Sequence, residues 1–504
     1  MCLAIGVARG GRGDERALHQ LDAGRDIGFH SVSVLLLILW NIHSICAGPR
    51  RQDAVQGQER WLPTLRLTGC PLTARRYDAE ERKESMERRT FLGAATAASF
   101  TIVKPELVRG SQRNSAVRLA LYGCGGRGTG VAESFITNTG AQLTALGDLF
   151  PDPLSLAKDK LDTAAAKAGK PGIDRSQLFK GPKSLEDVLA SKEVDAIYIA
   201  TPPYFHPEHL EKVVASGKHV YCEKPVGVDV ASCKRVMKIG EQAKGKLSLV
   251  IGFQLRFAPP YVELVNRVKA GALGSMVCGL SHYYAGAIER PDWPGSTPKQ
   301  LRLRNWIHDR TLSGDIIVEQ NIHLIDVNNW LMGAHPVRAQ GVAGRKGRRD
   351  KGDCSSHYNV TYTYEPDIHI TLTSTQFIDG SWDVAMRFFG TDGNAEMKYD
   401  APVRITGKNK WDAPGVGVPA QNQGAAAAAG AFKGAIEDAD AEKERDFIAS
   451  ITSGQFRNEA AQGAESTLSA ILGRTAATLG RTVNWDEVTS SSEHLDAGLD
   501  VAKL

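Results

Sequence analysis

Apolar residues in the first half of the chain fall in short continuous runs that are separated by helical patterns. Such runs occur at Val117–Tyr122, in the stretch that ends at Asp148, at Ala196–Ala200 and at His219–Cys222. Continuous apolar runs are typical of parallel strands that are covered by helices on both faces. The pattern therefore predicts a doubly wound α/β domain over residues 114–245.

From Lys246 onward the pattern changes to alternating and β-branched runs. These runs, VCGLSHYYAG, HYNVTYTYE, IHITLTSTQFI and DVAMRFFGTDGNAEMKY, are typical of an open, mostly antiparallel sheet. A helix is predicted over residues 313–333, SGDIIVEQNIHLIDVNNWLMG, with Ser313 or Asp315 as its cap. These elements predict a second α/β domain over residues 246–504, in which the low-complexity run 412–432 forms a flexible insertion.

The segment before residue 114 lacks the pattern of a folded domain. Residues 1–85 are rich in Arg and Gly, and their apolar run Ser31–Trp40 is too short to span a bilayer. Residues 86–113 begin MERRTFLGAATAASFTIV, where an arginine pair precedes an apolar run as in a twin-arginine export signal. We therefore expect translation to start at Met86, with residues 1–85 disordered or non-native, and a periplasmic or otherwise extracytoplasmic location. A short amphipathic helix is the alternative. No A-x-A cleavage site follows, so the signal could stay attached to the chain. Beyond such an uncleaved signal, we expect no stable membrane span.

The composition fits two soluble globular domains. The chain has 504 residues, 42% hydrophobic and 23% charged, which is enough to bury two cores. A net charge of +4, evenly spread, argues against a nucleic-acid partner. The eight cysteines form no CxxC pair and have no metal-ligand spacing, so we expect neither a disulfide framework nor a metal site.

A glycine-rich loop follows the first predicted strand. The motif Gly123-x-Gly125-x-x-Gly128, which also contains Gly126 and Arg127, lies between a strand and a helix. This is the context that a dinucleotide-binding loop requires. Its glycines allow a tight turn and a close approach of the backbone to a pyrophosphate at the helix N-terminus.

Asp148 ends the second predicted strand, about 20–25 residues past the glycine loop, at the spacing of a ribose-binding acid. A carboxylate there accepts hydrogen bonds from the ribose hydroxyls and repels a 2′-phosphate, so NAD is the expected cofactor. Arg127 could reach such a phosphate, which leaves NADP open. The alternative role of Asp148 is to cap its own loop.

Short polar motifs follow the third and fourth predicted strands. Thr201 and Pro202 come after one strand, and Glu223 and Lys224 come after the other. Ligands of parallel α/β sheets bind at the carboxyl ends of the strands. We therefore expect Lys224 to emerge over the crevice where a nicotinamide would lie. The alternative is a surface lysine in a proline turn.

Glu319 and His323 lie four residues apart in a predicted helix, and therefore on one face. A carboxylate one turn away can orient an imidazole and raise its proton affinity, so His323 is a candidate general base for an alcohol that loses hydride. Asp326 could hold the other ring nitrogen or cap a neighbouring loop. The alternative is a structural histidine that Glu319 satisfies.

Further substrate candidates are weaker, and a core or solvated role stays open for each. They are Gln254 and Arg256, expected on one face of their strand, and residues of the types that bind sugars, namely Tyr283, Asn305, Trp306 and His308. The basic run GRKGRRDKG, residues 344–352, is interpreted as a solvated loop.

From Val117 to its end, the chain resembles the Gfo/Idh/MocA family, the glucose–fructose oxidoreductases and inositol dehydrogenases. The matching motifs are GCGGRG, ATPPYFH, EKPVG, GFQLRFAPPY and GDIIVEQNIHLIDVNNWLMG. The resemblance implies an N-terminal Rossmann domain, a C-terminal α/β domain with an open sheet, and homo-oligomers that form through that sheet. It also implies that Lys224 points at the reacting carbon, and that His206 and Glu223 belong to the nucleotide site. The chain departs from the family pattern at Glu319 and Asn321, where many members carry Asp and Gly.

We therefore expect an NAD(P)-dependent oxidoreductase that moves a hydride between nicotinamide and a CH–OH carbon of a sugar, sugar acid or polyol. Lys224 would position and polarise the oxygen, and His323, oriented by Glu319, would take the proton. Because little free NAD exists outside the cytoplasm, we expect a tightly held cofactor that a second substrate recycles. Two alternatives are a glycoside hydrolase that uses bound NAD transiently, as some relatives do, and an inactive nucleotide- or sugar-binding protein.

Overall fold

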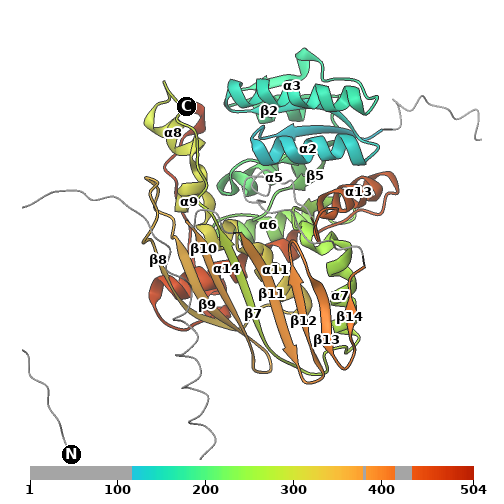
Figure 1. Ribbon diagram of the computed structural model, residues 1–504. Helices are drawn as coiled ribbons and strands as arrows, with labels where there is room; N and C mark the ends of the chain where they lie inside the picture. Colours follow the sequence, from blue (N-terminus) through green and yellow to red (C-terminus); the bar gives the residue numbers. More distant parts are fainter. Residues whose placement is uncertain (1–115, 378–381, 415–433) are drawn as a thin grey trace, which may run out of the picture. The chain divides into compact units, whose positions relative to one another are not determined.

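The computed structural model describes residues 116–377, 382–414 and 434–504 (Figure 1). The extension expected at 1–85, the signal-like segment at 86–113 and most of the insertion expected at 412–432 lie outside the described residues. Within the described ranges, no helix is long and apolar enough to cross a bilayer. In the same ranges, no group of three or more His, Cys, Asp or Glu side chains is placed to hold a metal ion.

The first half forms a parallel six-stranded sheet, as the apolar runs predict. The strand order is β3-β2-β1-β4-β5-β6. The strands are β1 Arg118–Tyr122, β2 Gln142–Asp148, β3 Leu178–Lys180, β4 Ala196–Ile199, β5 His219–Cys222 and β6 Leu249–Ile251. The helices of this half are α2 Gly126–Asn138, α3 Pro151–Lys167, α4 Ser184–Ala190, α5 His206–Ala215 and α6 Val230–Ala243. Leu119 of β1 pairs with Leu143 on one side and Ala196 on the other, so the strand order reverses at β1, where a ligand crevice is expected.

The parallel sheet extends past the domain boundary predicted at residue 245. Strand β6 pairs with β5, so it belongs to the first sheet and not to the second half. A late helix, α13 (Ala439–Thr452), also packs against α2. Phe447 of α13 makes edge-on ring contacts with Phe135 and Tyr221. The Rossmann half therefore includes residues from near the end of the chain.

The second half contains a nine-stranded, mostly antiparallel sheet of order β14-β13-β12-β11-β7-β10-β9-β8-β15. Its strands are β7 Met276–Ala285, β8 Arg338–Gly344, β9 His357–Tyr364, β10 Ile368–Gln376, β11 Asp383–Gly390, β12 Gly393–Lys398, β13 Val403–Gly407, β14 Trp411–Asp412 and β15 Val483–Asn484. Only β7 and β10 pair in parallel among the described strands of this sheet. These findings confirm the predicted fold class.

Helices cover one face of the nine-stranded sheet. They include α11 (Ile322–Met332) and α14 (Ala460–Leu479), which lie behind the strands in Figure 1. The strands alternate accordingly: Ile370 and Leu372 of β10 are buried under the helices, whereas Thr371 and Thr373 face the other side. The remaining helices of this half are α7 Pro259–Lys269, α8 Pro298–Arg304, α9 Arg310–Ser313, α10 Ile316–Glu319 and α15 Trp485–Ser490.

The helix predicted over residues 313–333 is broken into α10 and α11. Asp315 caps α10 with its carboxylate on the Ile316 N–H, and its φ is 75°. The carboxylate also accepts bonds from Ser355 and from the Tyr358 hydroxyl, at 2.8–3.0 Å. The break follows at Asn321, whose N–H bonds the Ile316 carbonyl five residues back instead of four. This wider turn changes the direction of the chain between Glu319 and His323.

Candidate active site

The glycine loop between β1 and α2 is shaped by its glycines. A Cβ on Gly123, whose φ is +99°, would lie 2.7 Å from the Ala200 backbone, and one on Gly128 would lie 2.0 Å from the Gly123 carbonyl oxygen. By contrast, a Cβ on Gly125 or Gly126 would meet nothing within 4 Å. Helix α2 begins here without a side-chain cap, so no capping side chain bonds its first N–H groups. This backbone is compatible with the close approach of a pyrophosphate that the sequence predicts.

A cavity of about 520 Å³ lies over this loop. The first half contributes the glycine loop, Asp148, Thr201 and Pro202, and the second half contributes Trp293, Arg304, Trp306 and Val501. We call this cavity the nucleotide crevice. Trp306, predicted as a substrate residue, lines this crevice, and so do Trp293 and Arg304, which no motif in the sequence indicates.

Asp148 caps the glycine loop and also lines the crevice. Its carboxylate accepts bonds from the Cys124 N–H at 2.7 Å and the Phe150 N–H at 2.8 Å. Burial raises the pKa of Asp148 to about 6, against the opposing effect of these two bonds. Both roles that the sequence left open, the loop cap and the ribose acid, are compatible with this position.

Arg127 does not line the nucleotide crevice, where the sequence left open a contact with a phosphate. Its Nε donates to Glu223 at 2.8 Å, and its two terminal nitrogens donate to Asp440 of α13 at 2.8 Å each. Tyr198 also donates to Glu223, at 3.0 Å. A guanidinium enclosed by two carboxylates has its donors satisfied inside the protein. Arg127 and Glu223 thus hold the Rossmann sheet to α13 and leave the glycine loop to its backbone N–H groups.

His206 joins the ends of β4 and β5. Its two ring nitrogens lie 2.7 Å from the carbonyl oxygens of Thr201 and Pro225, and the side chain is fully buried. Burial lowers its pKa, although both carbonyl bonds act in the opposite direction. The Thr201 hydroxyl bonds His209 Nδ1 at 2.9 Å. His206 therefore fixes the loop that carries Lys224 and does not itself line the crevice.

Glu319 holds Lys224 and not His323. The Lys224 ammonium donates to the backbone carbonyl of Glu319 and, at 3.0 Å, to its Oε1. The expectation that Glu319 orients the imidazole is therefore not met. Glu319 ends α10 and His323 lies in α11, so the break between the two helices takes them off a common helical face. The Nδ1 atom of His323 is buried with no hydrogen-bond partner among the described residues. Burial, and then the charges of Lys224 and Arg127, hold the pKa of His323 well below its usual value.

Asp326 is paired with Arg256 and not with His323. Arg256 Nε lies 2.9 Å from Asp326 Oδ2, and Gln462 and Ser466 donate to Oδ1 at 3.1 and 2.7 Å. Arg256 and Gln254 lie in a 3₁₀ turn, Gln254–Phe257, and not on the face of a strand as predicted. Asp326 thus fixes the turn after β6, and Arg256 has its charge balanced there.

Tyr283 of β7 is buried near Glu319. Its ring packs edge-on against Trp382 and Tyr399, at centroid distances of 5.5 and 6.1 Å. Burial, and then the charge of Glu319, raise the pKa of the Tyr283 phenol. Tyr283 therefore belongs to the apolar wall beside the Lys224–Glu319 pair.

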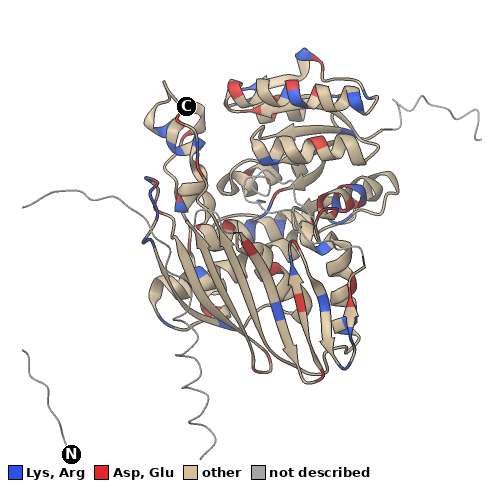
Figure 2. Cartoon of the chain, in the orientation of Figure 1, with Lys and Arg blue, Asp and Glu red and all other residues tan. Residues whose placement is uncertain are grey.

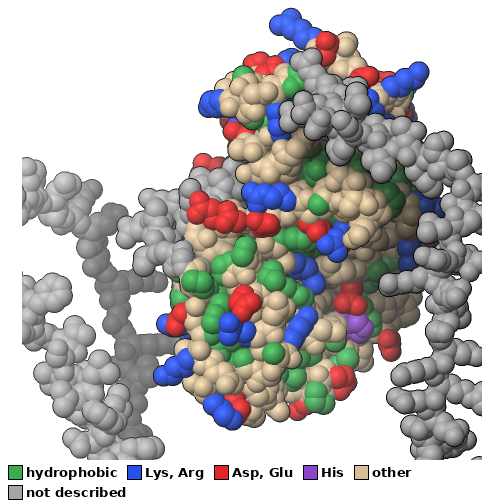
Figure 3. Space-filling view, turned by 90° about the vertical axis from the view of Figure 1, so that its right-hand side faces the viewer, with side chains coloured by type: hydrophobic (Ala, Val, Ile, Leu, Met, Phe, Trp, Pro, Cys, Tyr) green, Lys and Arg blue, Asp and Glu red, His purple; other side chains and the backbone are tan. Residues whose placement is uncertain are grey.

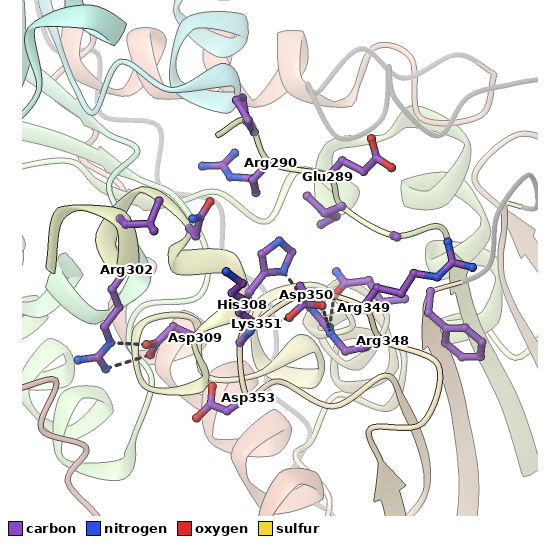
Figure 4. Close-up of a pocket in the computed structure, with 18 of the residues that line it drawn as sticks. Glu289, Arg290, Arg302, His308, Asp309, Arg348, Arg349, Asp350, Lys351 and Asp353 are labelled. Carbon is purple, nitrogen blue, oxygen red and sulfur yellow. Dashed lines mark hydrogen bonds and ion pairs between the residues drawn. The ribbon is translucent and has the colours of Figure 1, made fainter. Parts of the chain in front are cut away.

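A second cavity of about 830 Å³ lies against the second half (Figure 4). Its walls come from the segments 287–292, 298–309 and 347–353 and from the end of β10. Charged side chains of both signs line it: Glu289, Arg290, Asp292, Arg302, Asp309, Arg348, Arg349, Asp350, Lys351 and Asp353. The run at 344–352, interpreted from the sequence as a solvated loop, thus supplies part of this wall. We call this space the polar cavity.

The polar cavity approaches the Lys224–Glu319 pair through two amide side chains. Gln376, at its wall, donates to Gln320 at 3.1 Å, and Gln320 follows Glu319 directly. Arg348 fixes this wall by donating to Gln376 at 2.9 Å and to His308 Nδ1 at 2.8 Å. Lys224 and His323 themselves line neither of the two cavities.

Comparison with known proteins gives matches along most of the described chain. Residues 117–251 match a family model described as "Oxidoreductase family, NAD-binding Rossmann fold", and residues 261–396 match one described as "GFO/IDH/MocA C-terminal domain". The two matches together span more than half of the chain. An inositol 2-dehydrogenase of Rhizobium meliloti (strain 1021) is 26% identical over 57% of this chain and 78% of its own length. One from Acidothermus cellulolyticus is 25% identical over 58% of this chain and 77% of its own.

Solved structures share the fold at low sequence identity. A levoglucosan dehydrogenase in complex with NADH and L-sorbose has a TM-score of 0.57 and 16% identity, covering 73% of this chain and 99% of that chain. An aldose–aldose oxidoreductase from Caulobacter crescentus, in complex with glycerol, has a TM-score of 0.56 and 19% identity over the same shares.

Proposed function

Because the chain belongs to the Gfo/Idh/MocA family of NAD-binding oxidoreductases, we propose that it transfers a hydride between nicotinamide and a CH–OH carbon of a sugar, sugar acid or polyol. The curated relatives are named inositol 2-dehydrogenases, and structures of similar fold hold levoglucosan or L-sorbose. All of these are polyhydroxylated compounds, which is the substrate class proposed for this chain.

One observation carries the proposal: Glu319 fixes the Lys224 ammonium after a strand that neighbours the one bordering the nucleotide crevice. Lys224 follows β5, and the neighbouring strand β4 ends at residues that line the crevice. His323 is close enough for the charge of Lys224 to lower its pKa. A fixed cation and a neutral base are the two groups that oxidation of an alcohol requires.

The residues divide the reaction between them. A bound nicotinamide supplies the hydride acceptor, held by the glycine loop and by Asp148. Lys224, fixed by Glu319, donates a hydrogen bond to the substrate oxygen and stabilises the negative charge that develops there. His323 accepts the hydroxyl proton on its ring, because it is neutral at pH 7. Tyr283 and its aromatic neighbours exclude water on one side.

The polar cavity is the proposed entrance and substrate space. Its walls offer donors and acceptors of both signs, as a polyhydroxylated ligand needs (Figure 4). On the face in Figure 3, which is the side of α7 and α13, acidic and basic side chains are mixed with apolar ones.

A second candidate function is a redox-assisted glycoside hydrolase. At about 830 Å³, the polar cavity lies in the upper part of the range typical of drug-sized ligands, so it leaves room for an aglycone. The same Lys224 and His323 would then serve a transient oxidation. An inactive binding protein is the remaining alternative. It is kept because the ammonium of Lys224, which would have to act on the substrate, is already paired with Glu319.

One experiment separates these three functions. Purified protein is denatured to assay released nucleotide, and native protein is screened with free sugars, sugar acids, polyols and p-nitrophenyl glycosides. NADH formation with a free sugar or polyol supports the dehydrogenase. Nitrophenol release without net NADH supports the hydrolase. Bound NAD without turnover of any compound supports the binding protein.

We also propose that the uncovered face of the nine-stranded sheet joins two copies of the chain. Leu280 and Val342 on this sheet are 50% and 58% exposed. Arg387, Glu396 and Arg404 form a paired charge cluster across β11, β12 and β13, near the β14 edge (Figure 2). Analytical ultracentrifugation tests this: Leu280→Asp is expected to shift the protein toward the monomer.

Export is proposed on the sequence pattern alone. The arginine pair at residues 88–89 followed by an apolar run fits a twin-arginine signal. Cell fractionation of the wild type and of a variant with both arginines changed to lysine tests it. Retention of only the variant in the cytoplasm supports export by this route.

A further inference from the structure

Residues from the second half of the chain cover one end of the nucleotide crevice. Trp293, Arg304 and Trp306 line it together with the glycine loop. They lie outside residues 117–251, the part that matches the NAD-binding family model. We call residues 290–306 the cover segment.

Arg304 connects the cover segment to the Rossmann half. Its terminal nitrogens donate to both oxygens of Asp152, at 2.6 and 2.8 Å, in the bidentate geometry that a guanidinium favours. Its guanidinium carbon lies 3.9 Å from the ring centroid of Phe150 and 4.5 Å from that of Trp293. Its side chain is only 12% exposed. A charge this enclosed, between rings and a carboxylate, is held in one position.

These contacts lie at the ribose end of the crevice. Phe150 and Asp152 lie two and four residues after Asp148 in the chain, and the Phe150 N–H bonds the Asp148 carboxylate. The positive charge of Arg304 is also close enough to oppose the burial that raises the pKa of Asp148. The adenosine side of a dinucleotide would therefore lie beneath Arg304.

The rest of the cover segment is anchored independently of Asp152. Gln300 donates to the Leu504 carbonyl at 3.0 Å, and Arg302 donates to the Ala497 carbonyl. Leu303 packs in an apolar cluster with Phe205, Leu312 and Ala497. Loss of the Arg304–Asp152 pair would therefore open this end of the crevice, while the other contacts keep α8 in place.

We propose that Arg304 is a nucleotide-retaining residue: it closes the adenosine end of the crevice through Asp152, and the dinucleotide leaves only when this pair opens. The inference rests on the proposed NAD binding and adds the residue that controls its exchange. A crevice closed in this way favours an enzyme that keeps its nucleotide through both half-reactions.

The test is the rate at which bound NADH leaves the protein. Full-length protein loaded with NADH is mixed with excess NAD in a stopped-flow instrument, and energy transfer from tryptophan to NADH is followed. Trp293 and Trp306 line the crevice and serve as donors. Arg304→Ala is expected to release NADH at least about tenfold faster than the wild type, because it loses a bidentate pair and two ring contacts. Arg304→Lys keeps the charge without the planar fork and is expected to fall between them.

Asp152→Asn provides a second variant, because its side chain is 44% exposed and its change does not disturb the core. It is expected to accelerate release in the same direction and to remove the dependence of the release rate on salt. The matched control is Arg481→Ala, which breaks a bidentate pair with Glu487 that lies outside the crevice lining; it is expected to release NADH at the wild-type rate. Release at the wild-type rate from both Arg304→Ala and Asp152→Asn would overturn the proposal. A wild type that binds no NADH in equilibrium dialysis would instead overturn the nucleotide function itself.

Discussion

Glu319 is bound to Lys224, with 3.0 Å between its Oε1 and the lysine Nζ, and its own backbone carbonyl accepts from the same ammonium. Because the Lys224 ammonium donates to two oxygens of Glu319, both its position and its orientation are fixed. The lysine is therefore positioned before any substrate arrives.

Substitutions of Lys224 and of Glu319 are expected to lower kcat to different extents. Lys224→Ala is expected to lower kcat about 10²- to 10⁴-fold, since it removes the group proposed to stabilise the substrate oxygen. Glu319→Gln is expected to lower kcat less, because a neutral amide still accepts a bond from the ammonium. Steady-state kinetics would measure both, with Glu319→Asp as the conservative control. A pure rise in KM with unchanged kcat in Lys224→Ala would contradict the role given to the lysine.

His323 predicts the pH dependence of the rate. Its pKa is well below the usual value because burial and nearby cations disfavour the imidazolium, so the base stays neutral in mild acid. We expect kcat to stay level as the pH falls through 6.5 and to decline only at lower pH. His323→Gln is expected to lose about 10²- to 10⁴-fold in kcat and to remove that acid limb. A wild-type profile that bends at pH 6.5 would contradict this assignment.

Asp148 predicts a pH-dependent affinity for the nucleotide. Because its pKa is raised to about 6, the carboxylate becomes protonated as the pH falls through that value, and its bonds from a ribose diol weaken. The Kd for NADH is therefore expected to rise below pH 6, approaching about tenfold per pH unit if the proton must leave on binding. Titration calorimetry from pH 5 to 8 would measure it. Asp148→Asn is expected to flatten the curve and to reduce discrimination against NADPH.

Replacing Arg127 is expected to lower the stability of the fold while leaving the lining of the nucleotide crevice unchanged. Arg127→Leu leaves Glu223 and Asp440 without their cation, which is expected to lower the free energy of unfolding by about 3 kcal/mol. Urea unfolding at pH 7.5 would measure this. The control is Arg235→Leu, which breaks an exposed pair with Glu211 and is expected to cost at most about 1 kcal/mol.

His209 predicts that the folded protein becomes less stable in mild acid. Its pKa is lowered to about 3, chiefly by burial, whereas a histidine in the unfolded chain titrates near 6.5. Between these values the unfolded state holds a proton that the folded state lacks, so stability falls as the pH falls, by up to about 1.4 kcal/mol per pH unit. Urea unfolding at pH 5.0 and 7.5 should show a smaller difference for His209→Gln than for the wild type. His369→Gln, at an exposed position, should behave as the wild type does.

The Rossmann strands and the glycine loop could be predicted because their signals are local. Each parallel strand is a continuous apolar run, and the glycines are required by backbone contacts within the same βα unit. The break between α10 and α11 could not be predicted in this way, because its apolar residues keep a helical period. Contacts to Ser355 and Tyr358, some forty residues later, hold Asp315 at the start of α10.

The ion-pair partners of the charged site residues could not be predicted either, because they are distant in the sequence. Arg127 is separated from Asp440 by 313 positions, so nothing near the glycine loop indicates that its arginine is already paired. Arg304 and Asp152 are 152 positions apart. The stretch around Asn305, Trp306 and His308 was noted for its sugar-binding residue types, but its contact with the nucleotide half depends on how the two sheets meet.

The packing of α13 against α2 also sets an order of events during synthesis. A ribosome makes the glycine loop early, yet Phe447 and Asp440, which cover the neighbouring core and balance Arg127, emerge about 300 residues later. At roughly 5–20 residues per second, that delay is about 15–60 seconds. During this interval the nascent Rossmann half exposes apolar rings and an unpaired arginine, which makes it a substrate for chaperones. The core of the Rossmann half is therefore complete only when nearly the whole chain has been synthesised.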